Sequence, residues 1–222
     1  MELYLLFSTI NPRMNLKEFV KTYGQPYSEA LGITLSSSSN TEIVKWFLAS
    51  FLYSKPIRES SATKTYKVFE AHRILSADAI VEAGWDKLVA LLDEGGYTRY
   101  DYSTADRLLE IFGNLKRLYQ GDFTRLYEAS RDSEGLETRL KALGKGIGDT
   151  TVSIFLRDMR GVWRKADPKP TPLVYAGMKS LKTGDLKRFA RENSVDLIRI
   201  ETALLRYAKD FLKRGKRLPI TL

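Results

Sequence analysis

The sequence predicts an all-α protein, and three observations support this fold class. Apolar residues recur at helical spacing along most of the chain, as in NLKEFVKTYG (15–24) and DTTVSIFLRDMR (149–160). Serines stand three residues before carboxylates at the head of two such runs, which is a capping-box pattern. Strand signals are confined to LYLLF (3–7) and LPITL (218–222), and either could equally be helix or coil.

The expected helices follow from these signals in chain order. Ser39-x-x-Glu42 and Ser103-x-x-Asp106 supply the two capping boxes, and the run after Ser39 is apolar nearly all round, as in a buried central helix. Ser76 and Asp86 resemble N-caps of two short helices. The other helices are expected over 15–24, 59–72, 136–143, 149–160, 172–181, 184–193 and 195–214.

Composition excludes several kinds of site. The chain has no Cys and one His, His72, so disulfides, thiolate zinc sites, cysteine-held clusters and a multi-histidine metal site are not expected. We expect neither a metal nor a cofactor. No apolar run reaches the ~18 residues that cross a membrane, and MELYLLFSTI does not read as a signal peptide, so a soluble cytoplasmic protein is expected.

The charge balance favours a polyanionic partner. Lys and Arg number 36 against 27 Asp and Glu, which gives a net charge of +9 and a pI near 9.6. Such a surface suits nucleic acid, although it also serves solubility alone.

The stretch LGKGIGDTTVSIF (143–155) is the most informative motif. Gly146 and Gly148 permit positive φ and a close approach of the backbone to a ligand. The helix that follows begins near Asp149, and its first N–H groups are suited to bind a phosphate. A Gly-x-Gly between helices is also often only a tight corner.

The pattern L-x-x-L-x-x-G-I-G, followed by a Thr-rich apolar helix, resembles the helix-hairpin-helix of the endonuclease III-like (HhH-GPD) DNA glycosylases. The resemblance covers roughly residues 35 to 180, and this chain looks closest to members without an iron–sulfur cluster. Asp167, 19 residues beyond Gly148, matches the family's key Asp after a Gly/Pro-rich loop.

The resemblance implies a two-lobed helical HhH-GPD fold with a cleft between the lobes. One lobe would combine residues 1–34 and 146–222, and a helical barrel would span 35–145. The implied function is a monomeric DNA repair glycosylase, nucleoid-associated in a prokaryote. It would flip a damaged or mismatched base out of double-stranded DNA and hydrolyse its glycosidic bond.

The resemblance also assigns candidate roles. Asp167 would stabilise the cationic sugar and direct water, although an Asp-Pro turn-former is an equally good interpretation. Tyrosines between helices are also commonly core residues, as we expect for Trp46, Trp85 and Trp163. The candidate DNA-binding residues are Lys145, Gly146, Gly148, Thr150, Thr151, Lys55 and Arg58, and the candidate base-pocket residues are Tyr97, Arg99, Tyr100 and Tyr102.

One departure bears on the reaction. Bifunctional members place a Lys two residues after the second hairpin glycine, where this chain has Thr150, which cannot form a Schiff base. Base removal without efficient strand scission is therefore expected, with Lys145, Lys165 and Lys169 as possible substitutes. The alternatives are a DNA-binding protein of the same fold without catalysis and an all-α interaction protein.

Overall fold

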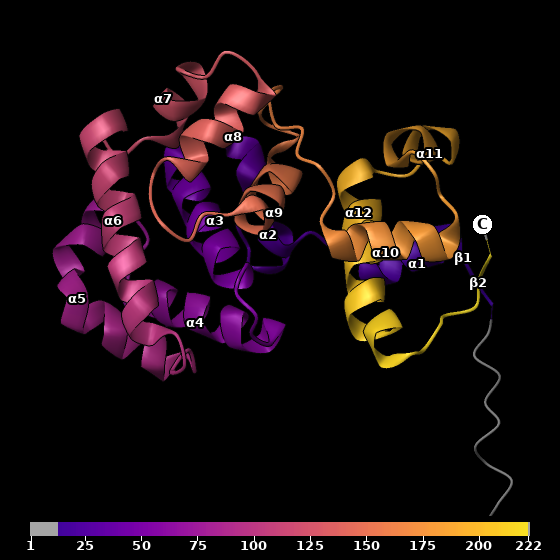
Figure 1. Ribbon diagram of the computed structural model, residues 1–222, viewed down its shortest axis with the longest axis horizontal. Coiled ribbons are helices and arrows are strands. Elements are labelled where there is room, and N and C mark those ends of the chain that lie inside the picture. The colour runs from indigo at the N-terminus through magenta and orange to yellow at the C-terminus, as the bar shows by residue number, and fades with distance from the viewer. Residues whose placement is uncertain (1–12, 222) are drawn as a thin grey trace, which may run out of the picture. The chain divides into compact units, whose positions relative to one another are not determined.

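The computed structural model describes residues 13–221, and this part of the chain is all-α (Figure 1). It contains twelve α-helices, two short 3-10 helices and a pair of two-residue strands. The α-helices are α1 (Leu16–Tyr23), α2 (Tyr27–Ala30), α3 (Asn40–Tyr53), α4 (Glu59–Ala71), α5 (Ala77–Glu94), α6 (Asp101–Tyr119), α7 (Phe123–Glu128), α8 (Ser133–Lys141), α9 (Asp149–Met159), α10 (Pro172–Leu181), α11 (Leu186–Glu192) and α12 (Leu197–Asp210). The 3-10 helices are η1 (Leu35–Ser37) and η2 (Leu212–Arg214), and the strands are β1 (Met14–Asn15) and β2 (Ile220–Thr221).

Each helix predicted from the sequence has a counterpart, and two short helices, α2 and α7, were not predicted. The tail 218–222 is extended in part, because β2 pairs in parallel with β1. The segment 3–7 lies outside the described residues.

Both capping boxes predicted from the sequence are wrong. Ser39 is the N-cap of α3, but its side chain makes no cap bond, and Glu42 accepts from the Thr34 backbone N–H at 2.8 Å and from Lys45 instead of from Ser39. Ser103 of the second box lies inside α6, whose N-cap is Tyr100, and Asp106 accepts from the indole of Trp85 at 2.9 Å. The partner of Asp106 is 21 residues away in sequence, whereas both partners of Glu42 are local.

The two short helices expected after Ser76 and Asp86 form one element with a break. Ser76 does cap α5, by accepting from the Ala79 N–H at 3.0 Å. Gly84 interrupts the helix with φ 70° and ψ 176°, a conformation that glycine adopts at little cost. Asp86 therefore lies inside the second helical part instead of capping it, and the break brings Trp85 to the surface, where it is 40% exposed.

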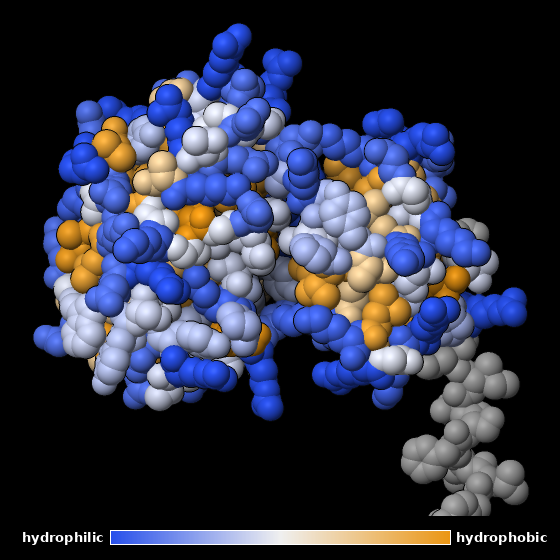
Figure 2. Space-filling view, viewed as in Figure 1, coloured by the Kyte–Doolittle hydropathy of each residue, from blue (hydrophilic) through white to orange (hydrophobic). Residues whose placement is uncertain are grey.

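The chain divides into two compact units, which are described separately. The central unit is contiguous and spans Tyr27–Lys169, whereas the terminal unit, within the described residues, combines 13–26 with 170–221. On the visible face in Figure 2, hydrophilic side chains cover much of each unit, with small apolar patches between them.

The central unit is built around α3, which is buried on nearly all sides, as its sequence predicts. Phe47 of this helix packs against the rings of Phe112, Phe123 and Phe155. Trp46 donates from its indole to the Phe155 carbonyl at 3.0 Å, so α3 is fixed to α9 by both packing and a buried hydrogen bond.

The helix after the hairpin, α9, belongs to the central unit, whereas the sequence placed 146–222 with the N-terminal segment. Its side chains explain the difference, because Asp158 accepts from the backbone N–H and hydroxyl of Ser28 at 3.2 and 2.8 Å. Asp158 also pairs with Arg157 at 2.7 Å, and both side chains are buried. This network joins α9 to α2, so the unit begins at Tyr27 and continues past α9.

The terminal unit brings the two ends of the described chain together around α12. Phe19 of α1 contacts Tyr207 edge-on, and Arg206 donates to the Tyr23 carbonyl at 2.8 Å. Helix α10 crosses α12 closely at Gly177, where a Cβ would lie 2.8 Å from the Leu204 carbonyl oxygen. The unit therefore forms only when segments far apart in sequence meet.

Gly95→Ala is expected to destabilise the protein by about 1 to 3 kcal/mol, because the site has no space for an added Cβ. A Cβ there would lie 2.5 Å from Thr65 Cα, which is backbone and cannot rotate away. Gly113→Ala is the matched control, since Gly113 lies inside α6 with open space around it. It is expected to stabilise by up to about 1 kcal/mol. Urea unfolding measures both, and equal effects would contradict the packing at Gly95.

Candidate nucleic-acid interface

The two glycines of the corner between α8 and α9 differ in backbone conformation, with a positive φ at Gly146 but not at Gly148. Gly146 has φ +92°, a region that favours glycine. Gly148 is extended, with φ −100° and ψ −175°, so it does not use the positive φ that glycine permits. Leu143 and Ile147 are buried beneath the corner and hold it against the unit.

Gly148 is the N-cap of α9, and the described residues offer no side chain that caps this end. The first N–H groups of the helix consequently carry the positive end of the helix dipole to an open surface. Thr150 is exposed beside them. Thr151 is buried, with Oγ1 2.9 Å from Ser54 Oγ and 3.4 Å from the Gly146 carbonyl, so it supports the corner from within.

Asp149, the acid beside this helix end, is paired with Lys141 across the hairpin at 2.6 Å. The hydrogen bond and charge of Lys141 lower the pKa of the Asp149 carboxyl, and the same contact raises the pKa of Lys141. Because the Asp149 side chain is 91% exposed, the pair adds little stability. Its effect is electrostatic, since it neutralises the one carboxylate in the first turn of α9.

Lys55 reaches the corner from the loop after α3. Its Nζ donates to the Gly146 carbonyl at 3.1 Å and lies 4.1 Å from the centre of the Phe51 ring. The side chain is half-buried, and burial together with the nearby charge of Arg107 lowers its pKa to about 8. Lys55 and Arg107 thus place two cationic side chains against one glycine.

Helix α6 supports the corner through a polar stripe that sequence analysis missed. Arg107, Glu110 and Asn114 follow at helical spacing, and each contacts the hairpin. Asn114 donates to the Leu143 carbonyl at 2.8 Å, and Glu110 accepts from the Lys145 N–H at 3.2 Å. The i, i+3, i+7 spacing was visible in the sequence, but a polar stripe on a helix is normally a solvated face.

The loop that carries Asp167 is fastened to α9. Ser153 donates to the Lys169 carbonyl at 3.0 Å, and Arg160 donates to the Pro168 carbonyl at 2.9 Å. Asp167 is exposed and directly precedes these two anchored residues. Lys169 is therefore held one turn into α9, whereas Pro168, next to Asp167, is held by Arg160 at the C-terminal end of this helix.

The lysines proposed as substitutes for the missing hairpin lysine differ in their surroundings. Lys165 donates to the carbonyls of Tyr127 and Ser130 at 3.0 and 2.6 Å, which ties its ammonium to the end of α7. Lys145 and Lys169 are exposed, as is Arg58. Lys165 therefore has a structural role that the sequence did not reveal.

The base-pocket candidates are not equivalent. Tyr97 is 1% exposed and donates its hydroxyl to the Leu52 carbonyl at 2.6 Å, so it is a core residue, the alternative left open by the sequence. Tyr100 is half-buried, and Arg99 lies over its ring at 5.7 Å. Tyr102 is 61% exposed and packs on Trp85 with ring centres 5.3 Å apart.

The three tryptophans predicted as core residues have different outcomes, and the one histidine, His72, contacts α5. Trp46 and Trp163 are buried as expected, whereas the expectation for Trp85 is wrong because the break at Gly84 exposes it. His72 ends α4, and its ring lies 3.4 Å from Glu94 and from Lys87. It therefore faces α5 side chains.

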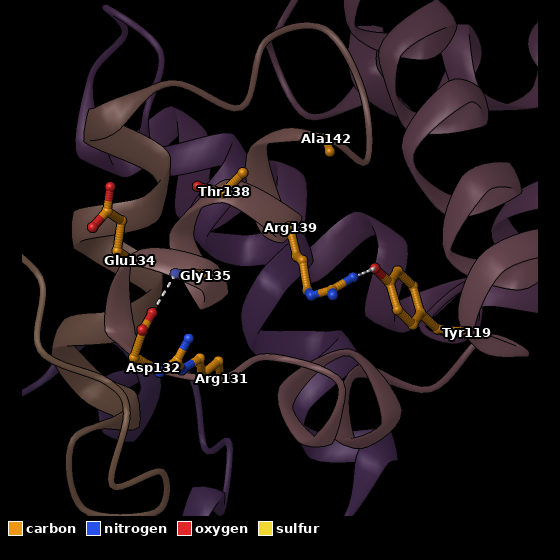
Figure 3. Close-up of a pocket in the computed structure, with 8 residues that line it drawn as sticks. All are labelled: Tyr119, Arg131, Asp132, Glu134, Gly135, Thr138, Arg139 and Ala142. Carbon is orange, nitrogen blue, oxygen red and sulfur yellow. Dashed lines mark hydrogen bonds between the residues drawn. The ribbon is translucent and has the colours of Figure 1, made fainter.

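A surface hollow of about 610 Å³ lies beside α8, away from the predicted site residues (Figure 3). Arg139 points across it toward the Tyr119 hydroxyl at 3.3 Å, while Asp132 accepts from the Gly135 N–H and caps the helix. Arg131 and Glu134 also line the hollow, so its charges are balanced. None of the candidate site residues lines this hollow.

Comparisons with protein-family models, curated proteins and solved structures find no match to this chain. Within residues 13–221, no helix is both long and apolar enough to cross a membrane. The same part of the chain contains no group of three His, Cys, Asp or Glu that could hold a metal.

Proposed function

We propose that the protein is a DNA repair glycosylase of the helix-hairpin-helix type, which binds double-stranded DNA as a monomer and removes a damaged or mismatched base. The observation that carries the proposal is the corner at Gly146. An uncapped helix end, a tight glycine turn and two cationic side chains, Lys55 and Arg107, converge there. Backbone N–H groups of this kind bind a phosphate, and the lysine and arginine add charge.

In this proposal Asp167 stabilises the cationic sugar as the glycosidic bond breaks, and it orients the attacking water. The support is positional, because the loop around Asp167 is held against the same helix whose N-terminus would hold the phosphate. The absence of a lysine at position 150 favours hydrolysis of the base alone.

The second candidate is a DNA-binding protein of the same fold without catalysis. Thr150 in the place of the lysine and the exposed position of Asp167 favour it. Both candidates predict salt-sensitive binding to duplex DNA, and they differ only in whether a base is released.

The deciding experiment incubates the protein with duplexes that contain uracil, 8-oxoguanine, alkylated purines or a T·G mismatch. Alkali treatment then reveals abasic sites, and an undamaged duplex is the control. Abasic product on any lesion supports the glycosylase. Salt-sensitive binding without product on the whole panel supports the second candidate, and no binding to any duplex contradicts both.

Affinity for duplex DNA is expected to fall several-fold between pH 7 and pH 9, because Lys55 loses its charge as the pH passes about 8. The depressed pKa means that the charged form dominates only below that value, so the contribution of Lys55 to binding is present at pH 7 and absent at pH 9. Lys55→Arg stays charged throughout and is expected to flatten this dependence. Fluorescence anisotropy at constant ionic strength measures both proteins, and identical profiles would contradict the role of Lys55.

A further inference from the structure

The positive charge of the protein is concentrated in the terminal unit. Residues 13–26 and 170–221 contain 15 Lys and Arg against 6 Asp and Glu, a net charge of +9. The central unit contains 21 against 20, a net charge of +1, although it carries the hairpin. The attraction for a polyanion that the whole composition predicts therefore resides chiefly outside the hairpin unit.

Within the terminal unit, the densest group of cations is the basic turn, defined as residues 213–217 (KRGKR). All five residues are exposed. Among residues 13–221, the side chains of Lys213, Arg214, Lys216 and Arg217 have neither a hydrogen bond nor an ion pair. Four like charges in five residues repel one another, and an anionic ligand would relieve that repulsion.

The backbone of the basic turn is fixed. Arg214 and Lys216 donate their N–H groups to the Phe211 carbonyl at 2.9 and 3.0 Å, and Gly215 turns the chain with φ +68°. Beyond the turn, β2 pairs with β1. The cations are therefore presented from an ordered backbone, which reduces the entropy lost when a ligand binds.

We propose that the basic turn is a second nucleic-acid site, which contacts the phosphodiester backbone independently of sequence. The inference rests on the proposed function in that the ligand is DNA. It adds that most of the electrostatic affinity comes from the terminal unit, while the hairpin contributes a local phosphate contact.

The neighbouring side chains favour a nucleic acid over an anionic membrane. A segment that binds at a membrane surface combines basic residues with exposed apolar anchors. Here the turn contains no apolar residue, and the flanking Leu212 and Leu218 are half-buried. Phe211 packs inside its own unit against Tyr23 and Tyr207. A turn of exposed cations that contains no apolar residue is suited to bind a phosphate backbone.

The test replaces Lys213, Arg214, Lys216 and Arg217 together by Gln in the full chain. Binding to an undamaged duplex is measured by anisotropy from 50 to 300 mM salt. Each phosphate contact adds about 0.9 to the slope of log K against log salt, so the slope is expected to fall by about 2 to 4. The matched control removes four charges elsewhere in the same unit, by Gln at Lys17, Lys21, Lys179 and Arg191, which are all exposed. Thermal unfolding checks that both variants remain folded.

A larger fall in slope for the basic-turn variant than for the control supports the proposal. Equal falls would show that the charge acts diffusely, and an unchanged slope would show that the turn contacts no phosphate; either result overturns it. Loss of binding to phosphatidylserine vesicles with unchanged duplex binding would also overturn it. The proposed function is tested separately, because release of a damaged base by the wild type does not depend on this slope.

Discussion

Asp167→Asn is expected to lower the rate of base removal by about a hundredfold to a thousandfold, with duplex affinity within about twofold of the wild type. The amide keeps the shape of the carboxylate but lacks the negative charge that would stabilise the developing cation, and electrostatic stabilisation of this kind is worth about that factor.

Single-turnover kinetics on the lesion with the highest activity measure this effect. Asp93→Asn is the matched control, since it removes the same charge from an exposed position on α5, and it is expected to retain full activity. Excision by Asp167→Asn at the wild-type rate would contradict the catalytic role of Asp167 while leaving the hairpin's role intact.

Gly148→Ala is expected to weaken duplex binding by more than tenfold while changing the stability by about 1 kcal/mol or less. The backbone at Gly148 is extended, a conformation open to any residue, and an added Cβ meets no atom within 4 Å. The methyl group would instead occupy the space in front of the first N–H groups of α9, where the phosphate is proposed to bind. Binding is therefore sensitive at a position where folding is not.

Gly146→Ala provides the contrast. Here φ is +92°, and a Cβ would lie 2.8 Å from Arg107 Cδ and 3.3 Å from Lys55 Nζ. We expect it to lower the free energy of unfolding by about 1 to 3 kcal/mol and to weaken binding as well. Urea unfolding and anisotropy on both variants separate the two effects. Wild-type affinity in Gly148→Ala would contradict a phosphate site at this helix end.

The sequence was sufficient for features that depend on local spacing. The all-α class and the limits of α10 follow from helical periodicity, a proline at the first position and the Thr171 N-cap. The burial of α3 follows from its nearly continuous apolar run. The tight turn at Gly146 follows from glycine chemistry.

Features that depend on distant partners were missed. Asp106 has the spacing of a capping box, but it accepts instead from Trp85, 21 residues away. The stripe on α6 that begins at Arg107 resembled a solvated face until the fold placed it against the hairpin. The charge asymmetry, by contrast, is visible in the sequence, because residues 170–221 alone contain 12 Lys and Arg against 5 Asp and Glu.

The order in which the two units close along the chain has a consequence for folding. The central unit is inserted between the two parts of the terminal unit, so α1 meets α12 only after residues 27–169 have been traversed. Bringing α1 and α12 together while residues 27–169 are unfolded would cost loop-closure entropy. If the central unit folds first, the connection is already compact and that cost is lower. We therefore expect the hairpin unit to mature first on the ribosome, and the basic unit to assemble as the last helix emerges.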